Sequence, residues 1–263
     1  MNNFIINIFD KTFIKSSNSS TGKKSPESFS YVIGEEDFDG ITIYTDRRFH
    51  KAKTTKANFK IAWQVESPAF SRPPRNPEDF DQIWTYNESL IEKNPQLYKR
   101  ANFGGTRVEN PTMFEKSKDI CIVHSGKRRT HKHLLRKKVI NQLEVDSFGR
   151  GTKRPFKKIE DVYKDYRFVI VIENIIHRNY FSEKLTDAIA CGCIPIYCGS
   201  KHNAESFFPG LTRFKNIKQL RNLLPTLTPE YYEANKPTEH IETVRRDFYT
   251  TEDWLVRNYY EKG

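Results

Sequence analysis

The stretch FVIVIENIIHRNYFSEKLTDAIACGCIPIYC, residues 168–198, constrains the fold of this chain more than any other. It begins with an almost wholly apolar run, FVIVI, and closes with a second one, IPIYC. Between them, SEKLTDAIA predicts a short helix with Ser182 as its N-cap. Apolar runs of this kind are typical of strands buried on both faces, as in parallel sheets covered by helices. The stretch therefore predicts a strand–helix–strand unit of an α/β protein.

The same alternation extends along the chain. The first half contains strand patterns at residues 4–9, 41–45, 59–65 and 83–86. The second half predicts strands at 119–125, 144–149, 168–172 and 194–198, with helices at 130–143, 159–165 and 182–190 and a mainly helical end. Strands that alternate with helices predict parallel sheets. We expect two α/β domains, at residues 1–115 and 116–263.

Polar residues follow several of these strands. Glu66, Ser125 and Glu173 each lie just past the carboxyl end of a predicted strand. Ligands of open parallel sheets bind beyond those ends. The sequence therefore predicts that these three residues converge on one binding site.

Lys184 lies in the first turn of the predicted 182–190 helix. The N-terminus of a helix carries partial positive charge and disfavours a cation. A bound phosphate would remove this conflict, because backbone N–H groups and the ammonium group would face the same anion. Glu183 beside it could accept hydrogen bonds from a ribose. The alternative is an exposed Glu–Lys pair; without a bound anion we expect Lys184 to be mobile.

The net charge of +11 predicts an anionic partner, either nucleic acid, a membrane surface or the phosphates of a nucleotide sugar. Much of the excess lies in GKRRTHKHLLRKK, residues 126–138, which contains no aromatic residue except two histidines. The hypothesis of nucleic-acid binding is weakened, because the run lacks aromatic side chains on which bases could stack. No apolar window is long enough to span a bilayer, and no signal peptide is recognised. Four cysteines without a zinc-site spacing fit buried thiols in a cytoplasmic protein, bacterial or viral.

Four elements resemble motifs of the α-1,3-fucosyltransferase family, inverting glycosyltransferase family 10, in the family's order. ENIIHRNYFSEKL resembles its F-E-N…Y-[TS]-E-K-L signature, and VDSFGR resembles D-x-[YF]-G-R. Arg136, seven residues before Leu143, resembles its R-x₆-L helix, and WQVESP resembles W-x-x-E-S-P. In place of the Y-R-x-D-S-D element of animal members, WTYNESL keeps only the tyrosine.

The resemblance implies a GT-B-type α/β fold, with two Rossmann-like domains whose parallel sheets face across a cleft. It implies fucose transfer from GDP-fucose to a glycan hydroxyl, in glycan biosynthesis or protein glycosylation, with no cofactor and no essential metal. Glu66 would be the general base. The donor would be bound by residues that match the family motifs or end the adjoining strand: Ser125, Arg136, Glu173, Asn174, Tyr180, Glu183 and Lys184.

Two alternatives stay open from the residues. The chain could be a related glycosyltransferase that uses another nucleotide sugar. In a different class, it could be a basic nucleic-acid-binding protein that uses residues 126–138. The donor and glycan acceptor are the expected partners, without nucleic acid and without an integral membrane segment; the oligomeric state is not predicted.

Overall fold

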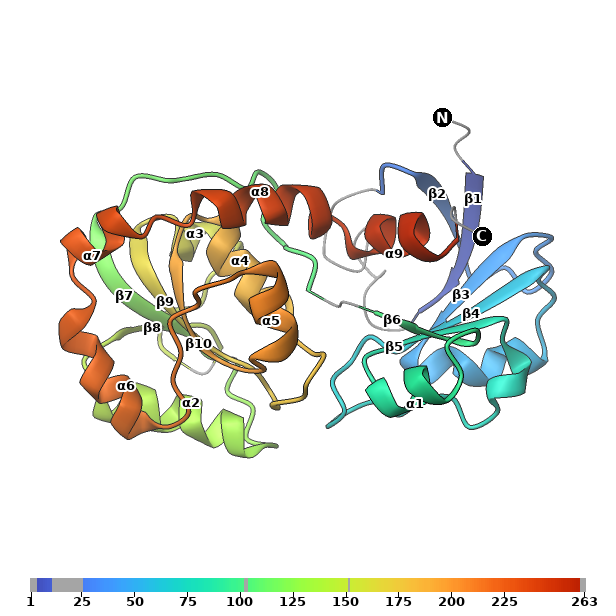
Figure 1. Ribbon diagram of the computed structural model, residues 1–263, viewed down its shortest axis with the longest axis horizontal. Coiled ribbons are helices and arrows are strands. Elements are labelled where there is room, and N and C mark those ends of the chain that lie inside the picture. Colours follow the sequence, from blue (N-terminus) through green and yellow to red (C-terminus); the bar gives the residue numbers. More distant parts are fainter. Residues whose placement is uncertain (1–3, 11–25, 102–103, 151, 261–263) are drawn as a thin grey trace. The chain divides into compact units, whose positions relative to one another are not determined.

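The structure is a computed structural model that describes residues 4–10, 26–101, 104–150 and 152–260. The chain forms two compact units (Figure 1). Unit 1 comprises residues 1–103 together with 250–263, and unit 2 comprises residues 104–249. Each unit is built around its own parallel sheet, as the alternation of strands and helices predicts.

The sheet of unit 1 has the order β2-β1-β3-β4-β5-β6, and all its neighbouring strands are parallel. Its strands are β1 (Phe4–Phe9), β2 (Phe29–Ile33), β3 (Ile41–Thr45), β4 (Phe59–Trp63), β5 (Gln82–Thr85) and β6 (Tyr98–Arg100). The connections contain the 3₁₀ helices η1 (Asp46–Lys53) and η2 (Pro77–Asp79) and the helix α1 (Glu88–Lys93). The predicted strands of this half are confirmed, whereas β2 and β6 were not predicted.

The last helix, α9 (Thr251–Tyr259), belongs to unit 1. Asp253 in its first turn accepts hydrogen bonds from the backbone N–H groups of Glu27 (3.0 Å) and Ser28 (2.9 Å). Unit 2 therefore begins at Gly104 rather than at residue 116, and the C-terminal helices do not all belong to it. The predicted division differs because the contacts that anchor α9 are separated by more than 200 residues and leave no local pattern.

The sheet of unit 2 has the order β10-β9-β7-β8 and is also parallel. Its strands are β7 (Lys118–Val123), β8 (Asp146–Phe148), β9 (Tyr166–Ile172) and β10 (Ile194–Cys198). The helices are α2 (His131–Gln142), α3 (Glu160–Tyr163), α4 (Glu183–Ala190), α5 (His202–Phe207), α6 (Ile217–Leu223), α7 (Pro229–Ala234) and α8 (Thr238–Asp247), with the 3₁₀ helix η3 (Leu224–Thr226).

Strand β9 is buried on both faces, as its apolar run predicts. Val169 and Val171 face a core that includes Leu185 of α4. Phe168 and Ile170 face the opposite core, together with residues of α2 and α6. Figure 1 shows α3, α4 and α8 on one side of this sheet and α2 and α6 on the other. The sheet is therefore the middle layer of three.

The turn between α4 and β10 explains the CGC sequence. Gly192 has a positive φ of 71°, and its N–H donates to the carbonyl of Ile189 at 2.8 Å, which ends the helix. A Cβ atom at Gly192 would lie 3.0 Å from the sulfur of Met113. All four cysteines are free and buried, so the interpretation of buried thiols is confirmed.

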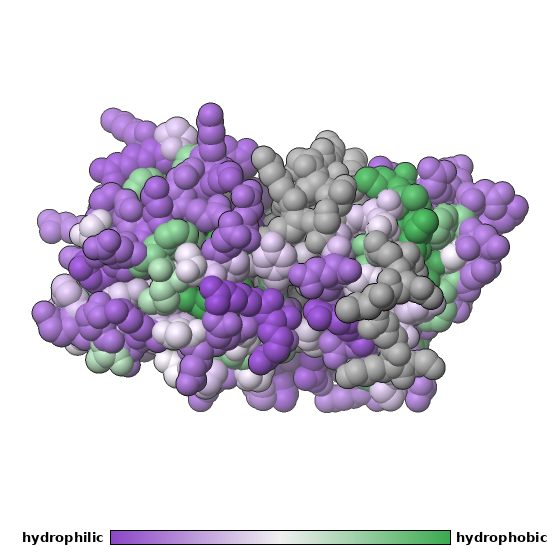
Figure 2. All heavy atoms as spheres, turned by 90° about the horizontal axis from the view of Figure 1, so that it is seen from above, coloured by the Kyte–Doolittle hydropathy of each residue, from purple (hydrophilic) through white to green (hydrophobic). Residues whose placement is uncertain are grey.

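The surface differs between the units on the face drawn in Figure 2. Unit 2 is mainly hydrophilic there, whereas hydrophobic residues gather on one part of unit 1. Ile5 of β1 and Ile33 of the edge strand β2 are the most exposed large hydrophobic residues among those described. No helix in the described part of the chain is long and apolar enough to cross a membrane.

Candidate functional site

The topology of unit 2 creates a switch point between β7 and β9. The chain leaves the inner strand β7 for β8 on one side and then crosses to β9 on the other. In open parallel sheets, ligands bind beyond the carboxyl ends of the strands at such a point. Ser125 follows β7 and is exposed, whereas Glu173 and Asn174 follow β9. The predicted position of Ser125 and Glu173 after strand ends is confirmed.

Arg136 brings a guanidinium group from α2 to this point. Its Nε lies 3.0 Å from the carbonyl oxygen of Ile172, the last residue of β9, and its Nη2 lies 3.0 Å from Oδ1 of Asn174. The residue is only 4% exposed, and burial lowers its pKa, against the opposing effect of Glu173 and Glu183. Among the described residues Nη1 has no hydrogen-bond partner. The edge of the guanidinium that carries Nε and Nη2 is thus fixed by the end of β9 and by Asn174.

The carboxylate of Glu173 binds the N-cap residue of α4 rather than being available to a ligand. It is fully buried, and its two carboxylate oxygens accept from the backbone N–H (2.9 Å) and the hydroxyl (2.7 Å) of Ser182. Ser182 is the N-cap residue, as predicted, but its side chain makes no capping bond. Glu173 therefore fixes the start of α4, and its carboxylate is occupied by these two bonds.

Lys184 has partners of its own within the protein. Its Nζ lies 2.8 Å from the hydroxyl oxygen of Ser182, 3.4 Å from Oε1 of Glu183 and 3.8 Å from Oε2 of Glu173. Two carboxylates thus compensate for a cation at the positive end of the helix. The expectation that Lys184 depends on a bound anion and is otherwise mobile does not fit these contacts. Its side chain is still 26% exposed and can reach a ligand.

Glu183 is held as a carboxylate. Burial raises its pKa, but the neighbouring Lys184 and Arg107 outweigh burial and lower the pKa to about 2. Oε1 of Glu183 lies 4.0 Å from Nη2 of Arg107, and the Glu183 side chain is 23% exposed. A partly exposed, ionised carboxylate beside cations can accept hydrogen bonds from a pair of hydroxyl groups.

A second ion pair, between Arg107 and Asp187, was not predicted from the sequence. Asp187 is fully buried in α4 and accepts from Nε (2.7 Å) and Nη2 (2.6 Å) of Arg107. It also accepts from the backbone N–H of Arg107 (2.7 Å) and the hydroxyl of Thr106 (3.0 Å). The pair fixes Arg107 next to Glu183, although 80 residues separate its members.

Replacing Asp187 by Ala is expected to destabilise unit 2 by roughly 2–4 kcal/mol, because several donors lose a charged acceptor. The midpoint of urea unfolding measures the loss. The matched control is Asp119→Ala, since Asp119 pairs with Arg167 but is 63% exposed. That variant is expected to lose less than about 1 kcal/mol. Equal midpoints for the two variants would contradict the structural importance of the buried pair.

His133 shows that cations gather at the switch point. Burial, together with the positive charge of neighbours that include Arg136, Lys127 and Lys184, lowers its pKa to about 4. His133 is 1% exposed, and its Nδ1 lies 2.8 Å from the hydroxyl oxygen of Thr130, the N-cap residue of α2. It is therefore neutral near pH 7, while the cations around it come from both α2 and α4.

The basic run 126–138 is divided between interior and surface. Arg136 and His133 are buried, and Nζ of Lys132 lies 3.2 Å from the sulfur of Cys198. Other cations of the run, such as Lys138, are exposed. The run is therefore neither a continuous surface stripe nor a uniformly solvated helix face.

Two further residues expected to bind the donor differ in accessibility. Tyr180, in the loop between β9 and α4, is only 3% exposed. Asn174 is partly exposed, and its Oδ1 accepts a hydrogen bond from Arg136.

In the part of the chain that the structure describes, no group of three or more His, Cys, Asp or Glu residues could hold a metal ion.

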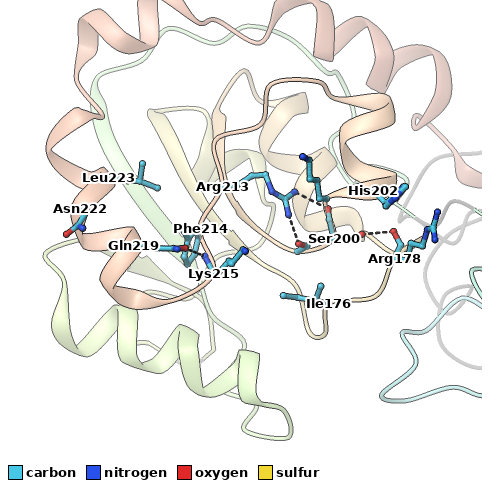
Figure 3. A pocket seen from close by; sticks show the side chains of 12 residues that line it. Ile176, Arg178, Ser200, His202, Arg213, Phe214, Lys215, Gln219, Asn222 and Leu223 are labelled. Carbon is cyan, nitrogen blue, oxygen red and sulfur yellow. Dashed lines mark hydrogen bonds between the residues drawn. The ribbon is translucent and has the colours of Figure 1, made fainter.

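A pocket of about 740 Å³ opens beside the same loop (Figure 3). Ile176 and Arg178 of the loop line one side, and Phe214 and Lys215 line another. Arg213 donates to the carbonyl oxygens of Ser200 (3.1 Å) and Gly199 (3.0 Å), which fixes the segment that follows β10. The remaining lining residues are Lys201, His202, Gln219, Asn222 and Leu223. The pocket combines apolar walls with cations.

Glu66 lies in unit 1, after β4. Its backbone N–H donates to the carboxylate of Asp46, and its carbonyl oxygen accepts from the hydroxyl of Tyr86 at 3.0 Å. The side chain is partly exposed, and no described residue makes a hydrogen bond or ion pair with its carboxylate. Such a carboxylate can accept a proton. The predicted convergence of Glu66 with the residues of unit 2, and the cleft between the units, stay predictions.

Residues 113–236 match the family model described as "Glycosyltransferase family 10 (fucosyltransferase) C-term". This segment of the chain is thus similar to the C-terminal part of glycosyltransferase family 10. The resemblance that the sequence motifs indicate is confirmed, and Arg136, Glu173, Asn174, Glu183 and Lys184 all lie inside the matched segment.

Curated relatives of the chain are fucosyltransferases. A fucosyltransferase-like protein of Arabidopsis thaliana is 26% identical over 126 residues, which cover 47% of this chain and 24% of that protein. The 4-galactosyl-N-acetylglucosaminide 3-alpha-L-fucosyltransferase 9 of Bos taurus is 32% identical over 201 residues, covering 65% of this chain and 54% of that protein. The chain thus spans between about a quarter and about half of these relatives.

A crystal structure of an alpha1,3-fucosyltransferase with GDP has a similar fold, with a TM-score of 0.58 at 12% identity. The similarity covers 97% of this chain and 89% of that one, so it includes both units and not only residues 113–236. Together with the two parallel sheets, it makes the fold GT-B type, as the sequence motifs imply.

Proposed function

We propose that this chain is an inverting glycosyltransferase that transfers fucose from GDP-fucose to a hydroxyl group of a glycan. The proposed activity is like that of α-1,3/1,4-fucosyltransferases. The observation that carries the proposal is the group of cations at the switch point, within the segment that matches family 10. The names of the curated relatives support fucose as the sugar. The solved structure with GDP supports a guanosine nucleotide as the carrier.

The donor is proposed to bind with its diphosphate at the start of α4. Lys184 supplies a point charge, and the open Nη1 edge of Arg136 supplies a planar donor. Glu183, ionised and partly exposed, accepts hydrogen bonds from the ribose hydroxyls. Glu173 takes no direct part in this assignment, because Ser182 occupies both of its oxygens. A direct contact of the buried Tyr180 with the donor requires the loop to move.

The proposed reaction is a single displacement. The acceptor oxygen attacks the anomeric carbon of fucose, while the bond from that carbon to the diphosphate oxygen breaks on the opposite face. The proton of the acceptor hydroxyl passes to the carboxylate of Glu66, which has no other partner among the described residues. Arg136 and Lys184 stabilise the charge that develops on the leaving GDP. The step inverts the anomeric configuration and assigns no task to a metal ion.

A thermal-shift panel tests the donor. GDP-fucose and GDP are expected to raise the melting temperature, in the presence and absence of EDTA, whereas UDP and UDP-galactose are not. A preference for UDP would overturn GDP-fucose as the donor, and a shift lost in EDTA would show that a metal takes part. An RNA oligonucleotide serves as a further probe. Stabilisation by RNA without stabilisation by GDP would favour the nucleic-acid-binding alternative.

A further inference from the structure

Asp46 lies at the same edge of the unit 1 sheet as Glu66. It is the first residue after β3, and β3 pairs with β4 in parallel so that Thr45 is opposite Trp63. The chain therefore leaves the two strands at the same edge of the sheet. Asp46 and Glu66 follow those ends and meet there.

The carboxylate of Asp46 holds the backbone that leads into Glu66. Oδ1 accepts from the N–H of Val65 at 3.1 Å, and Oδ2 accepts from the N–H of Glu66 at 3.1 Å. Oδ1 also accepts from the hydroxyl of Ser71 at 2.5 Å, which ties the following turn to the same carboxylate. Both oxygens are thus occupied by the segment that carries the proposed base.

A second strand neighbour holds the same peptide from the other side. Tyr86 is the first residue after β5, and its hydroxyl donates to the carbonyl oxygen of Glu66 at 3.0 Å. Since the order is β3-β4-β5, the residues that follow the two flanking strands bind the N–H and the C=O of Glu66. The backbone of Glu66 is therefore fixed from both sides while its carboxylate is left open.

This arrangement is unfavourable for Asp46 itself in two respects. Asp46 is the sole non-glycine residue with a positive φ (34°) among those described, and such backbone strain gathers at functional sites. Burial, with a smaller contribution from the charge of Glu66, raises the pKa of Asp46 to about 6. A raised carboxyl pKa means that the folded state favours the protonated form. At neutral pH the fold thus keeps Asp46 ionised and at a positive φ, although both conditions are unfavourable for this residue.

We propose that Asp46 is a positioning residue that, together with Tyr86, clamps the peptide of Glu66 and so aims its carboxylate at the acceptor hydroxyl. The inference rests on the proposed role of Glu66 as general base. A base must lie within about 3 Å of the proton that it removes, so a small displacement of its backbone slows the reaction. Donor binding, assigned to unit 2, does not depend on the clamp.

The test compares Asp46→Asn with a matched variant, Asp253→Asn. Asparagine tolerates a positive φ about as well as aspartate, but its amide group presents N–H to a backbone N–H that needs an acceptor. Asp253 makes a similar set of bonds elsewhere in unit 1, accepting from two backbone N–H groups and from the hydroxyls of Ser28 and Thr250. Both variants lose a carboxylate that accepts from two backbone N–H groups and at least one hydroxyl, and only Asp46 touches Glu66.

For Asp46→Asn, kcat for transfer from GDP-fucose to galactosyl-N-acetylglucosamine is expected to fall about 10–100-fold, with an unchanged KM for GDP-fucose. Tyr86→Phe removes the opposite contact without changing charge and is expected to lower kcat by a smaller factor. Asp253→Asn is expected to lower the melting temperature without changing kcat. In a Glu66→Gln background, Asp46→Asn is expected to cause no further loss, because the group that it positions is gone.

Three outcomes distinguish an error in the proposed clamp from an error in the proposed role of Glu66 as base. If Glu66→Gln abolishes transfer while Asp46→Asn and Tyr86→Phe retain the wild-type kcat, the clamp is wrong and the base assignment stands. If Asp46→Asn lowers kcat by the same factor with and without Glu66, Asp46 does not act through Glu66 and the clamp is again wrong. If Glu66→Gln retains full transfer, the base assignment is wrong and the clamp with it.

Discussion

Glu66→Gln is expected to lower fucose transfer by roughly 10²–10⁴-fold and to leave the dissociation constant of GDP unchanged. The amide cannot take the proton of the acceptor hydroxyl, and general-base catalysis contributes about that factor. The backbone of residue 66 is held by Asp46 and Tyr86, so the glutamine occupies the position of the glutamate. Single-turnover transfer from radiolabelled GDP-fucose measures the rate, and calorimetry measures GDP binding.

Glu78→Gln is the matched control for this substitution. Glu78 also lies in unit 1, and its carboxylate accepts from the side chain of Asn76 at 3.0 Å on the exposed surface. It is expected to transfer fucose at the wild-type rate. Loss of GDP binding in Glu66→Gln, in proportion to the loss of transfer, would contradict the role of Glu66 as base and point to a general effect on the protein.

Lys184→Ala is expected to weaken GDP binding about 10–100-fold. A charge-assisted contact with a phosphate contributes about 1.5–3 kcal/mol, and each 1.4 kcal/mol changes the dissociation constant tenfold. The substitution also removes the ammonium group that lies beside both Glu173 and Glu183, which makes the start of α4 less favourable for an anion. Calorimetry of GDP binding at low and high salt measures the effect.

Lys138→Ala removes one positive charge from an exposed position of the same unit and serves as control. GDP binding is expected to remain within about twofold of the wild type, since α2 presents Lys138 to solvent. An unchanged GDP dissociation constant in Lys184→Ala would contradict the phosphate assignment. Equal weakening in both variants would show that GDP responds to net charge rather than to the start of α4.

The sequence predicts the inner strands of the two sheets better than it predicts the edge strands. The apolar run of β9 specifies a strand with two buried faces, and its predicted range differs from the observed one by two residues at the start. The edge strands β2 and β6 were missed, because β6 reads YKR and lacks an apolar pattern. An edge strand has only one neighbour, so fewer of its residues need to be apolar.

The position of the site was predictable, but the direction of its side chains was not. Strand ends and the family signature place Ser125, Glu173 and Lys184 at the switch point. Whether Glu173 points to the ligand or to Ser182 depends on contacts across the loop, which no local pattern encodes. Asp46 follows β3 in the same way that Glu66 follows β4, so the rule that identified Glu66 could also have identified Asp46.

We propose that the chain transfers fucose from GDP-fucose by one inverting displacement. Incubating the protein with GDP-fucose and galactosyl-N-acetylglucosamine, and following GDP release together with the NMR spectrum of the product, tests it directly. We expect one fucosylated product for each GDP released, with the anomeric configuration opposite to that of the donor. A product with the donor's configuration, or consumption of a UDP-sugar but not of GDP-fucose, would contradict it.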